Sequence, residues 1–277
     1  MVSNTSIVFM GITSVFVLAL AIALPIVIKK KWQTAVSPYF IGWAVFFVFA
    51  LVLESLMHSA VLGATGDTIT GNMWLYALYG GFAAGIFEET GRFLAMKLLM
   101  KKHYSNSHNA LMYGAGQGCF EALILVGLTM IGNIALAAMI NAGQTDMLLA
   151  SVPAEQQETL KLGFSQLTDT PSYMFLLSAF ERISAVIVHI SFSVLVWTAV
   201  VKKKFYFYPL AIFLHALFDG VAVIMQSCGV NTIVIEIALF AFSAGIALFT
   251  YYIWKKELKS YKTESVTAVS ENGETEQ

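Results

Sequence analysis

The stretch Phe87-Glu88-Glu89-Thr90-Gly91-Arg92 places three charged side chains inside a segment, residues 73–100, that is otherwise apolar enough to cross a membrane. A carboxylate or guanidinium in hydrocarbon costs roughly 2.5 to 3.5 kcal/mol even on the mildest insertion scale, so such groups persist only where partners or water receive them. On a helix, Arg92 lies one turn from both Glu88 and Glu89. The stretch therefore predicts a buried polar site with two Glu and one Arg, around which the rest of the chain is organised.

The composition is that of an integral membrane protein. Hydrophobic residues make up 58% of the 277 residues, charged residues only 12%, and the mean hydropathy is +0.73. A helix needs about 20 apolar residues to cross the bilayer. The sequence therefore predicts an all-α, polytopic membrane bundle of about seven transmembrane helices. The expected spans are 7–28, 38–62, 73–97, 110–139, 173–201, 206–225 and 233–254.

Clusters of lysine orient these helices. They occur at alternate ends of successive spans, at 29–31, 101–102, 202–204 and 255–256. The positive-inside rule places all of them on the cytoplasmic side, which predicts an N-terminus outside and a C-terminus inside. Lys161 is the single Lys or Arg in the connections on the other side, which are 63–72, 141–172 and 227–232. We expect a multi-pass protein of the cell membrane, and the lysines, which serve topology, predict no binding to nucleic acid.

Residues 1–260 are expected to form a single transmembrane domain, and the polar tail 261–277 is expected to be disordered. The first span has no basic residue before its apolar run, which predicts an anchor and not a cleaved signal peptide. The connection 141–172 predicts a short amphipathic helix on the outer surface. Cys119 and Cys228 have neither the spacing of a zinc site nor that of a disulfide framework.

Ionisable residues of four predicted helices share one depth. Counted from the lysine-bearing ends, they lie about 9 to 12 residues into their spans, roughly 13 to 18 Å at 1.5 Å per residue. This depth predicts a shared polar layer that is reachable from the cytoplasmic side. His215 and Asp219 are one helical turn apart, so we expect Asp219 to hold one imidazole nitrogen of His215. The residues at the common depth are Glu88, Glu121, His189 and His215.

Two helix faces made of glycine occur on the same predicted helices as these acids. Gly81-x-x-x-Gly85 lies on the third predicted helix and Gly114-x-x-x-Gly118 on the fourth. Faces without side chains let helix backbones approach closely. We therefore expect these two helices to pack against each other and to bring Glu121 to the level of Glu88.

Not every buried charge is interpreted as functional. A lone ionisable group in a membrane helix is more often a paired structural group than a reactive one. This interpretation is favoured for the groups that do not share the common depth, which are Glu54, His58, Glu181, Arg182 and Glu236. The functional interpretation is favoured for Glu88, Glu89, Arg92, Glu121, His215 and Asp219, and His189 stands evenly between the two.

The ordered motifs resemble a known family. Glu88-Glu89-x-x-Arg92, followed by Glu121, His189 and His215-x-x-x-Asp219 on later helices, is similar to the YhfC-type membrane peptidases. That family belongs with the CAAX prenyl protease and bacteriocin-processing (CPBP) group, the PrsW peptidases and the anterior-pharynx-defective subunit of gamma-secretase. The resemblance covers roughly residues 73–220 and implies a peptidase-like core at 73–225. Prenyl proteases place the Arg one position further from the Glu pair and a His where Glu121 stands. PrsW peptidases carry a Lys as the basic residue and an aromatic where Gln117 stands.

The resemblance implies a glutamate-type intramembrane endopeptidase, with a peptide or membrane-protein substrate and a cavity in the cytoplasmic half of the bilayer. A carboxylate away from bulk water suits a general base for attack of water on a peptide carbonyl, and Glu88 is the candidate. Glu89 and Arg92 would orient it. His215 would position the water or stabilise the oxyanion. The remaining members of the expected catalytic pocket are Asp219, Glu121 and His189.

Other chemistries are weighed beside this one. The sequence has no HExxH, no Gly-x-Ser-x-Gly and no pair of membrane-embedded Asp residues. A zinc ion stays open as an alternative, since its competent ligands here are Glu88, Glu121, His189 and His215. A proton-coupled transporter or channel would use the same acids and histidines but needs a polar path through both halves of the membrane. A catalytically silent scaffold is the third possibility, as the gamma-secretase subunit suggests.

Overall fold

A computed structural model describes residues 1–258, and every regular element within them is a helix, which confirms the expected all-α class. The expected tail, 261–277, lies outside the described residues. Helices form over each of the seven expected segments. These are α1 (Asn4–Trp32), α2 (Ser37–Phe46) continued by η1 (Phe47–Glu54) and α3 (Ser55–Thr65), α5 (Met73–Leu98), α6 (Asn109–Glu121) continued by η3 (Ala122–Leu128) and α7 (Thr129–Asn141), α10 (Tyr173–Val201), α11 (Phe207–Ser227), and α12 (Thr232–Ile253) continued by η4 (Trp254–Leu258).

Short helices join these rods. The connection 141–172 contains the expected short helix, α9 (Ala154–Asp169), preceded by α8 (Thr145–Ala150). The other short elements are α4 (Asp67–Thr70) and η2 (Lys101–His103). Six of the seven long helical segments are apolar enough over sufficient length to cross a membrane. The exception is α5, because its charged residues lower its hydropathy. The seventh span and the orientation of the termini therefore stay predictions.

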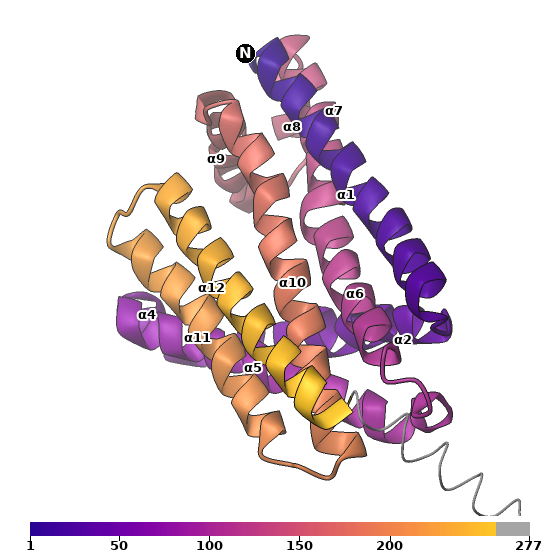
Figure 1. Ribbon diagram of the computed structural model, residues 1–277. Coiled ribbons are helices and arrows are strands. Elements are labelled where there is room, and N and C mark those ends of the chain that lie inside the picture. The colour runs from indigo at the N-terminus through magenta and orange to yellow at the C-terminus, as the bar shows by residue number, and fades with distance from the viewer. Residues whose placement is uncertain (259–277) are drawn as a thin grey trace, which may run out of the picture.

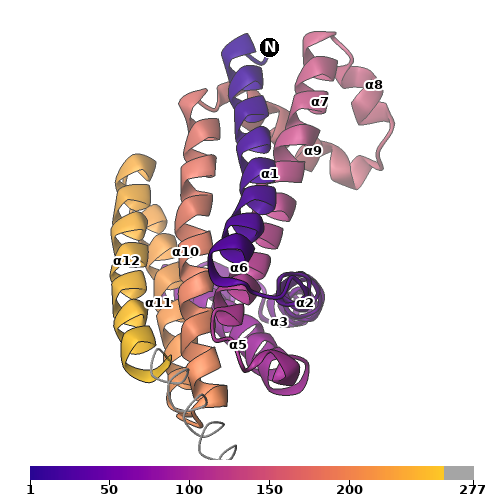
Figure 2. The same ribbon diagram turned by 45° about the vertical axis from the view of Figure 1, so that its right-hand side comes forward.

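The helix α10 lies at the centre of the bundle. Its most apolar window is 72% buried, whereas the corresponding windows of the other five candidate spans are 17–28% buried. Figures 1 and 2 show α1, α6, α11 and α12 around α10, and in Figure 1 α2 and α5 cross behind these helices at a steep angle. The residues that α10 carries are consequently the ones most shielded from lipid.

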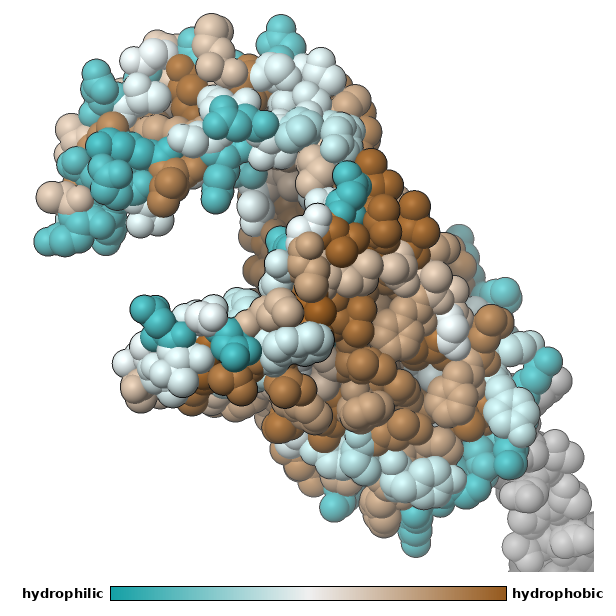
Figure 3. Space-filling model, turned by 90° about the vertical axis from the view of Figure 1, so that its left-hand side faces the viewer, coloured by the Kyte–Doolittle hydropathy of each residue, from teal (hydrophilic) through white to brown (hydrophobic). Residues whose placement is uncertain are grey.

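The two sets of helix ends lie on opposite sides of the molecule. The lysine-bearing ends of α1, α5, α10 and α12 gather at the lower right of Figure 1, whereas the N-terminus, α4, α9 and the connection between α11 and α12 lie toward the upper left. In Figure 3, hydrophilic residues gather on the projecting lobes and along the lower right edge, and hydrophobic residues cover the surface between them. This distribution suits a chain that crosses a bilayer with all its lysine clusters on one side.

The glycine faces make close helix contacts, although not with each other. A Cβ on Gly85 would lie 2.7 Å from the carbonyl oxygen of Ile212 on α11, and one on Gly118 would lie 2.9 Å from the Cα of Val186 on α10. The expectation that these two faces pack together is therefore wrong. Each face instead admits the backbone of a helix that carries one of the site histidines. This pairing brings α5 to α11 and α6 to α10.

Replacing Gly81 with Ala is expected to destabilise the protein by about 1 to 3 kcal/mol, because overpacking forces backbones apart. The new Cβ would meet the carbonyl oxygen of Ala216 on α11. Gly80→Ala is the matched control, since nothing lies within 4 Å of a Cβ at that position. Thermal unfolding of both purified variants in the same detergent measures the difference. Equal midpoints would contradict the packing of α5 on α11.

Candidate functional site

A chain of buried hydrogen bonds runs through the polar layer, and Arg92 is its centre. Arg92 donates from Nη1 to Glu89 Oε2 at 2.8 Å and from Nε to Gln117 Oε1 at 2.7 Å. The other carboxylate oxygen of Glu89 lies 2.9 Å from His215 Nδ1. Because an ionised carboxylate only accepts, Nδ1 of His215 carries the proton of this bond. Glu89 thereby fixes the ring so that its Nε2 is the nitrogen left for other partners.

The same arginine orients the second histidine. The Nη2 group of Arg92 lies 2.9 Å from His189 Nδ1, and a guanidinium can only donate, so Nδ1 accepts. The Nε2–H of His189 then donates to Glu121 Oε2 at 2.6 Å. Glu121 Oε1 accepts from Arg182 Nη1 at 2.6 Å, and Arg182 also pairs with Glu181. His189 is thus a bridge between two charged groups, with both ring nitrogens engaged.

Glu88 takes no part in this network of hydrogen bonds. Its Oε2 is buried and has no hydrogen-bond partner among the described residues. His189 Nδ1 lies 3.8 Å from it, which is beyond hydrogen-bonding distance, and that nitrogen already accepts from Arg92. A buried polar oxygen without a partner costs free energy unless a water or a ligand satisfies it. The two adjacent acids therefore differ: both carboxylate oxygens of Glu89 are hydrogen-bonded, whereas Oε2 of Glu88 has no partner among the described residues.

A cavity of about 130 Å³ lies against Glu88. At about 30 Å³ per molecule, this volume corresponds to on the order of four waters. The ionisable residues that line it come from α5, α6, α10 and α11. They are Glu88, Glu121, Glu181, Arg182, His189, His215 and Asp219. The structure thus brings Glu88, Glu121, His189, His215 and Asp219 to one cavity, and it places Glu89 and Arg92 directly behind its wall.

The cavity extends away from the lysine-bearing ends of the helices. On α10 its lining runs from Glu181 to His189 and no further toward Val201, and on α11 it runs from His215 to Ala222. Side-chain exposure follows the same direction, from 6% at His215 to 37% at Asp219 and 39% at Glu181. The expected access from the lysine-bearing side is not what the structure shows.

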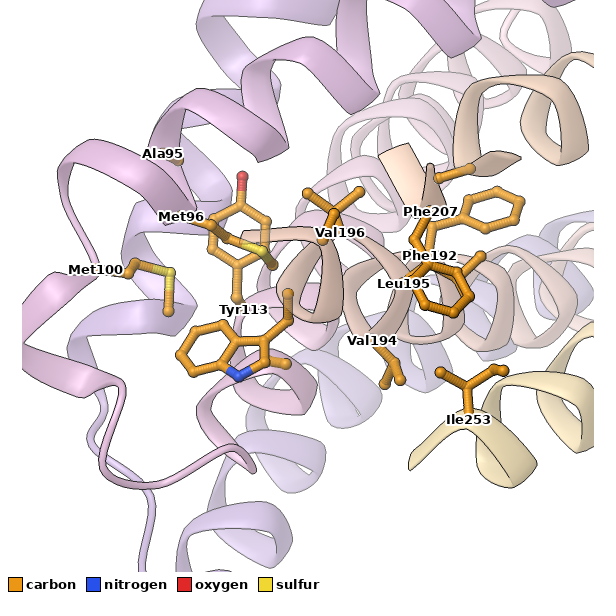
Figure 4. Close-up of a cluster of buried hydrophobic side chains, with 14 of the residues drawn as sticks. Ala95, Met96, Met100, Tyr113, Phe192, Val194, Leu195, Val196, Phe207 and Ile253 are labelled. Carbon is orange, nitrogen blue, oxygen red and sulfur yellow. The ribbon is translucent and has the colours of Figure 1, made fainter. Parts of the chain in front are cut away.

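Large apolar side chains fill the space between the polar residues and the lysine-bearing ends of the helices. Met96, Tyr113, Phe192 and Leu195 are fully buried in one cluster (Figure 4). On α5, α6 and α10 each of them lies nearer the lysine-bearing end than the polar residue of the same helix, which is Arg92, Gln117 or His189. This apolar core separates the polar chain from the side on which the lysines lie. Depth along a helix could be counted from the sequence, but the side on which the core closes could not.

Two partners in this site differ from those expected or were missed. His215 Nε2 lies 3.5 Å from Asp219 Oδ2, too long for a hydrogen bond, so Glu89 and not Asp219 orients the ring. Gln117 and Arg182, which bond to Arg92 and Glu121, were not assigned to the site from the sequence. Spacing could have indicated both, because Gln117 lies one helical turn before Glu121 and Arg182 lies two turns before His189.

The remaining buried charges lie in or beside smaller groups. His58 Nε2 lies 3.1 Å from Glu54 Oε1, and His58 Nδ1 lies 2.8 Å from the hydroxyl of Tyr79. These three side chains form a cluster separate from the hydrogen bonds around Arg92. Glu236 Oε2 is buried without a hydrogen bond among the described residues, and Glu236 does not line the cavity. Two π-helical stretches adjoin this region, since η1 ends at Glu54 and η3 begins directly after Glu121. Such turns are frequent at functional sites.

The donor chemistry around the cavity fits a zinc ion. Glu88, His215 and Asp219 line the cavity and offer two carboxylates and one imidazole nitrogen, and catalytic zinc commonly takes three protein ligands of these kinds. Within residues 1–258, no three His, Cys, Asp or Glu side chains are already arranged as a metal site. Binding would therefore require these side chains to turn toward one another. Glu121 and His189, which were also expected as zinc ligands from the sequence, are hydrogen-bonded to each other.

Comparisons with known proteins match the part of the chain that contains this site. The family model described as YhfC intramembrane metalloprotease matches residues 16–239, which include every residue of the cavity. A protein of Bacillus subtilis (strain 168), named uncharacterized membrane protein YhfC, is 39% identical over 229 residues, which cover 82% of this chain and 87% of that relative. No solved structure matches the chain.

Proposed function

Because this chain belongs to the YhfC intramembrane metalloprotease family, we propose that it is an intramembrane endopeptidase that cleaves a peptide bond at the cavity beside Glu88. Glu88 carries the proposal, since it lines a cavity sized for a few waters and its buried Oε2 has no hydrogen-bond partner among the described residues. The chain is a multi-pass integral membrane protein, as its six apolar helices and its membrane-protein relative show. Its substrate is a peptide or a membrane protein.

The reaction follows from the positions of Glu88 and His215. Glu88 accepts a proton from a water in the cavity, and the water oxygen attacks the carbonyl carbon of the scissile bond. In its protonated form, His215 donates from Nε2 to the oxyanion that develops on the carbonyl oxygen. Glu88 then passes its proton to the amine nitrogen, the C–N bond breaks, and a carboxylic acid and an amine leave. Since the cavity holds only a few waters, the substrate segment enters when the lining helices part.

The buried chain of hydrogen bonds serves positioning. Glu89 fixes the ring of His215, and Arg92 holds Glu89 through a bond of 2.8 Å. His189 and Glu121 extend this support to Arg182 on the wall of the cavity. These residues keep the cavity's polar groups in place without touching the reacting bond. A metal ion, when bound by Glu88, His215 and Asp219, would supply Lewis-acid polarisation of the carbonyl group.

The structure does not favour the transport alternative. A proton relay needs polar groups or water along the whole path across the membrane. The outer part of such a path is present, since Arg182 and Glu181 continue it away from Glu88. The other half is filled by apolar side chains such as Phe192 and Leu195. A cavity that opens on one side suits hydrolysis better than transport.

The roles of His215 and Asp219 are separated by two substitutions. His215→Gln is expected to lower the turnover of a cleaved membrane peptide by roughly two orders of magnitude, because the donor to the oxyanion is lost. Asp219→Asn is expected to cost roughly tenfold or less, since Asp219 is 3.5 Å from the ring and Glu89 orients it. Turnover in proteoliposomes measures both. A loss in Asp219→Asn as large as that in His215→Gln would mean that Asp219 acts directly, as a metal ligand or as a base.

Removal of metal ions is expected to leave the thermal midpoint of the protein unchanged. The Arg92 chain is closed by protein groups alone, so a metal ion at the cavity would be catalytic and not structural. Unfolding scans with and without a chelator measure this. A clear fall of the midpoint on chelation would contradict it. Turnover in the same samples assigns the mechanism: loss that zinc restores indicates the metal-dependent form, and unchanged turnover the water-only form.

A further inference from the structure

A second cavity lies apart from the catalytic site, near the lysine-bearing ends of α1 and α12 and beside the middle of α10. Its volume is about 410 Å³, and it is lined by side chains of α1, α10 and α12 and by residues at the start of α6. Its inner part is apolar, with Ile187, Ile190 and Val194 on α10 and Ala247 on α12. The polar chain around Arg92 does not contribute to it. The mechanism proposed above makes no use of this groove.

A row of aromatic rings forms the end of the groove that lies nearest the lysine clusters. Trp32 at the end of α1 stacks on His108 with ring centroids 5.4 Å apart, and His108 lies 4.8 Å from the ring of Trp254. Tyr251, one helical turn before Trp254, also lines the groove. Trp and Tyr side chains concentrate where a bilayer's hydrocarbon meets its headgroups. These aromatic rings therefore place the lysine-bearing end of the groove at the level of the lipid headgroups.

Two lysines stand over this aromatic end. Lys31 Nζ lies 4.8 Å from the ring centre of Trp32, and Lys255 Nζ lies 4.6 Å from that of Tyr251. Both rings line the groove, so each ammonium group lies beside a lining residue. The acid nearest in sequence, Glu257, is already paired with Lys204 at 2.7 Å. Within residues 1–258, the charges beside this end of the groove are consequently positive, whereas most of its lining is apolar.

We propose that this groove binds one anionic glycerophospholipid from the leaflet on the lysine-bearing side. Its phosphate lies between Lys31 and Lys255, and one acyl chain runs inward between α10 and α12. From Trp254 to Ala247 the groove extends roughly 10 Å along the helix, which is enough to take the upper part of an acyl chain. Basic pockets between membrane helices bind acidic lipid headgroups by the same charge complementarity. A zwitterionic lipid would fill the groove equally but would gain little from the two cations.

Native mass spectrometry of the full chain tests this with two lipids of identical acyl chains, phosphatidylglycerol and phosphatidylcholine. One phosphatidylglycerol is expected to bind at least tenfold more tightly than phosphatidylcholine. Lys31→Glu with Lys255→Glu should remove this preference. Lys101→Glu with Lys102→Glu is the matched control, because it makes the same change of charge at the same end of the molecule on residues that do not line or flank the groove.

A second variant tests the apolar part without altering charge. Ala247→Phe fills the groove and is expected to weaken the binding of phosphatidylglycerol by tenfold or more, while Gly245→Phe, a residue outside the lining, should not. Equal affinity for the two lipids, or equal loss in the Lys31/Lys255 and Lys101/Lys102 variants, would overturn the proposal. So would unchanged affinity in Ala247→Phe. Peptide cleavage is not a readout here, so the result is independent of the proposed function.

Discussion

Replacing Glu88 with Gln is expected to reduce peptide turnover by roughly two orders of magnitude or more, which is the size of a general-base contribution. The substitution keeps the shape of the side chain but removes the group that accepts the proton of water. Stability should change little, because Glu88 Oε2 has no hydrogen bond among the described residues to lose. Turnover in proteoliposomes and the thermal midpoint in detergent are measured on the same preparation.

Glu236→Gln is the matched control for this prediction. Glu236 also has a buried carboxylate oxygen without a hydrogen bond in the described part of the chain, but it does not line the cavity. It should therefore retain turnover close to that of the unaltered protein. Full turnover in Glu88→Gln would remove Glu88 from the reaction. A comparable loss in both variants would mean that the effect is not specific to the cavity.

Replacing Arg92 with Leu is expected to destabilise the protein by about 3 to 5 kcal/mol, the usual effect of removing one partner from a buried ion pair. Arg92 is fully buried and bonds to Glu89, Gln117 and His189. Its loss leaves the charge of Glu89 with His215 as its remaining partner. The free energy of unfolding in mixed detergent micelles measures the effect. Lys97→Leu, an exposed cation near the end of the same helix, is the control and should be nearly neutral.

A double substitution separates the ion pair from simple loss of volume. If Arg92 and Glu89 stabilise each other, Arg92→Leu with Glu89→Gln should be less destabilised than the sum of the two single changes. An additive result would mean that the two side chains contribute independently. It would then be wrong to describe Glu89 as the structural partner and Glu88 as the free acid.

The positions of the helices could be predicted from the sequence because hydrophobic runs are local. The segment 173–201 and α10 coincide, and the expected 233–254 differs from α12 by one residue at each end. The common depth of Glu88 and His215 also followed from counting along single helices. These inferences needed no knowledge of which helices are neighbours.

Partners between helices could not be predicted in the same way. The face of Gly81 and Gly85 meets α11, and no local pattern selects α11 over α6. His215 has two acids within reach, and a spacing of four residues favoured Asp219, whereas the packing of α5 on α11 presents Glu89. Arg182 was left out because it lies at another depth, yet its long side chain reaches Glu121.

The central claim is that the cavity at Glu88 cleaves peptide bonds. The most direct measurement maps new peptide termini in the membrane proteome of cells that lack this protein and are supplied either with the unaltered chain or with Glu88→Gln at equal abundance. The account predicts termini within or beside the membrane segments of specific proteins that appear with the unaltered chain and are absent with Glu88→Gln. Identical sets of termini, together with proton flux in liposomes that Glu88→Gln abolishes, would contradict it.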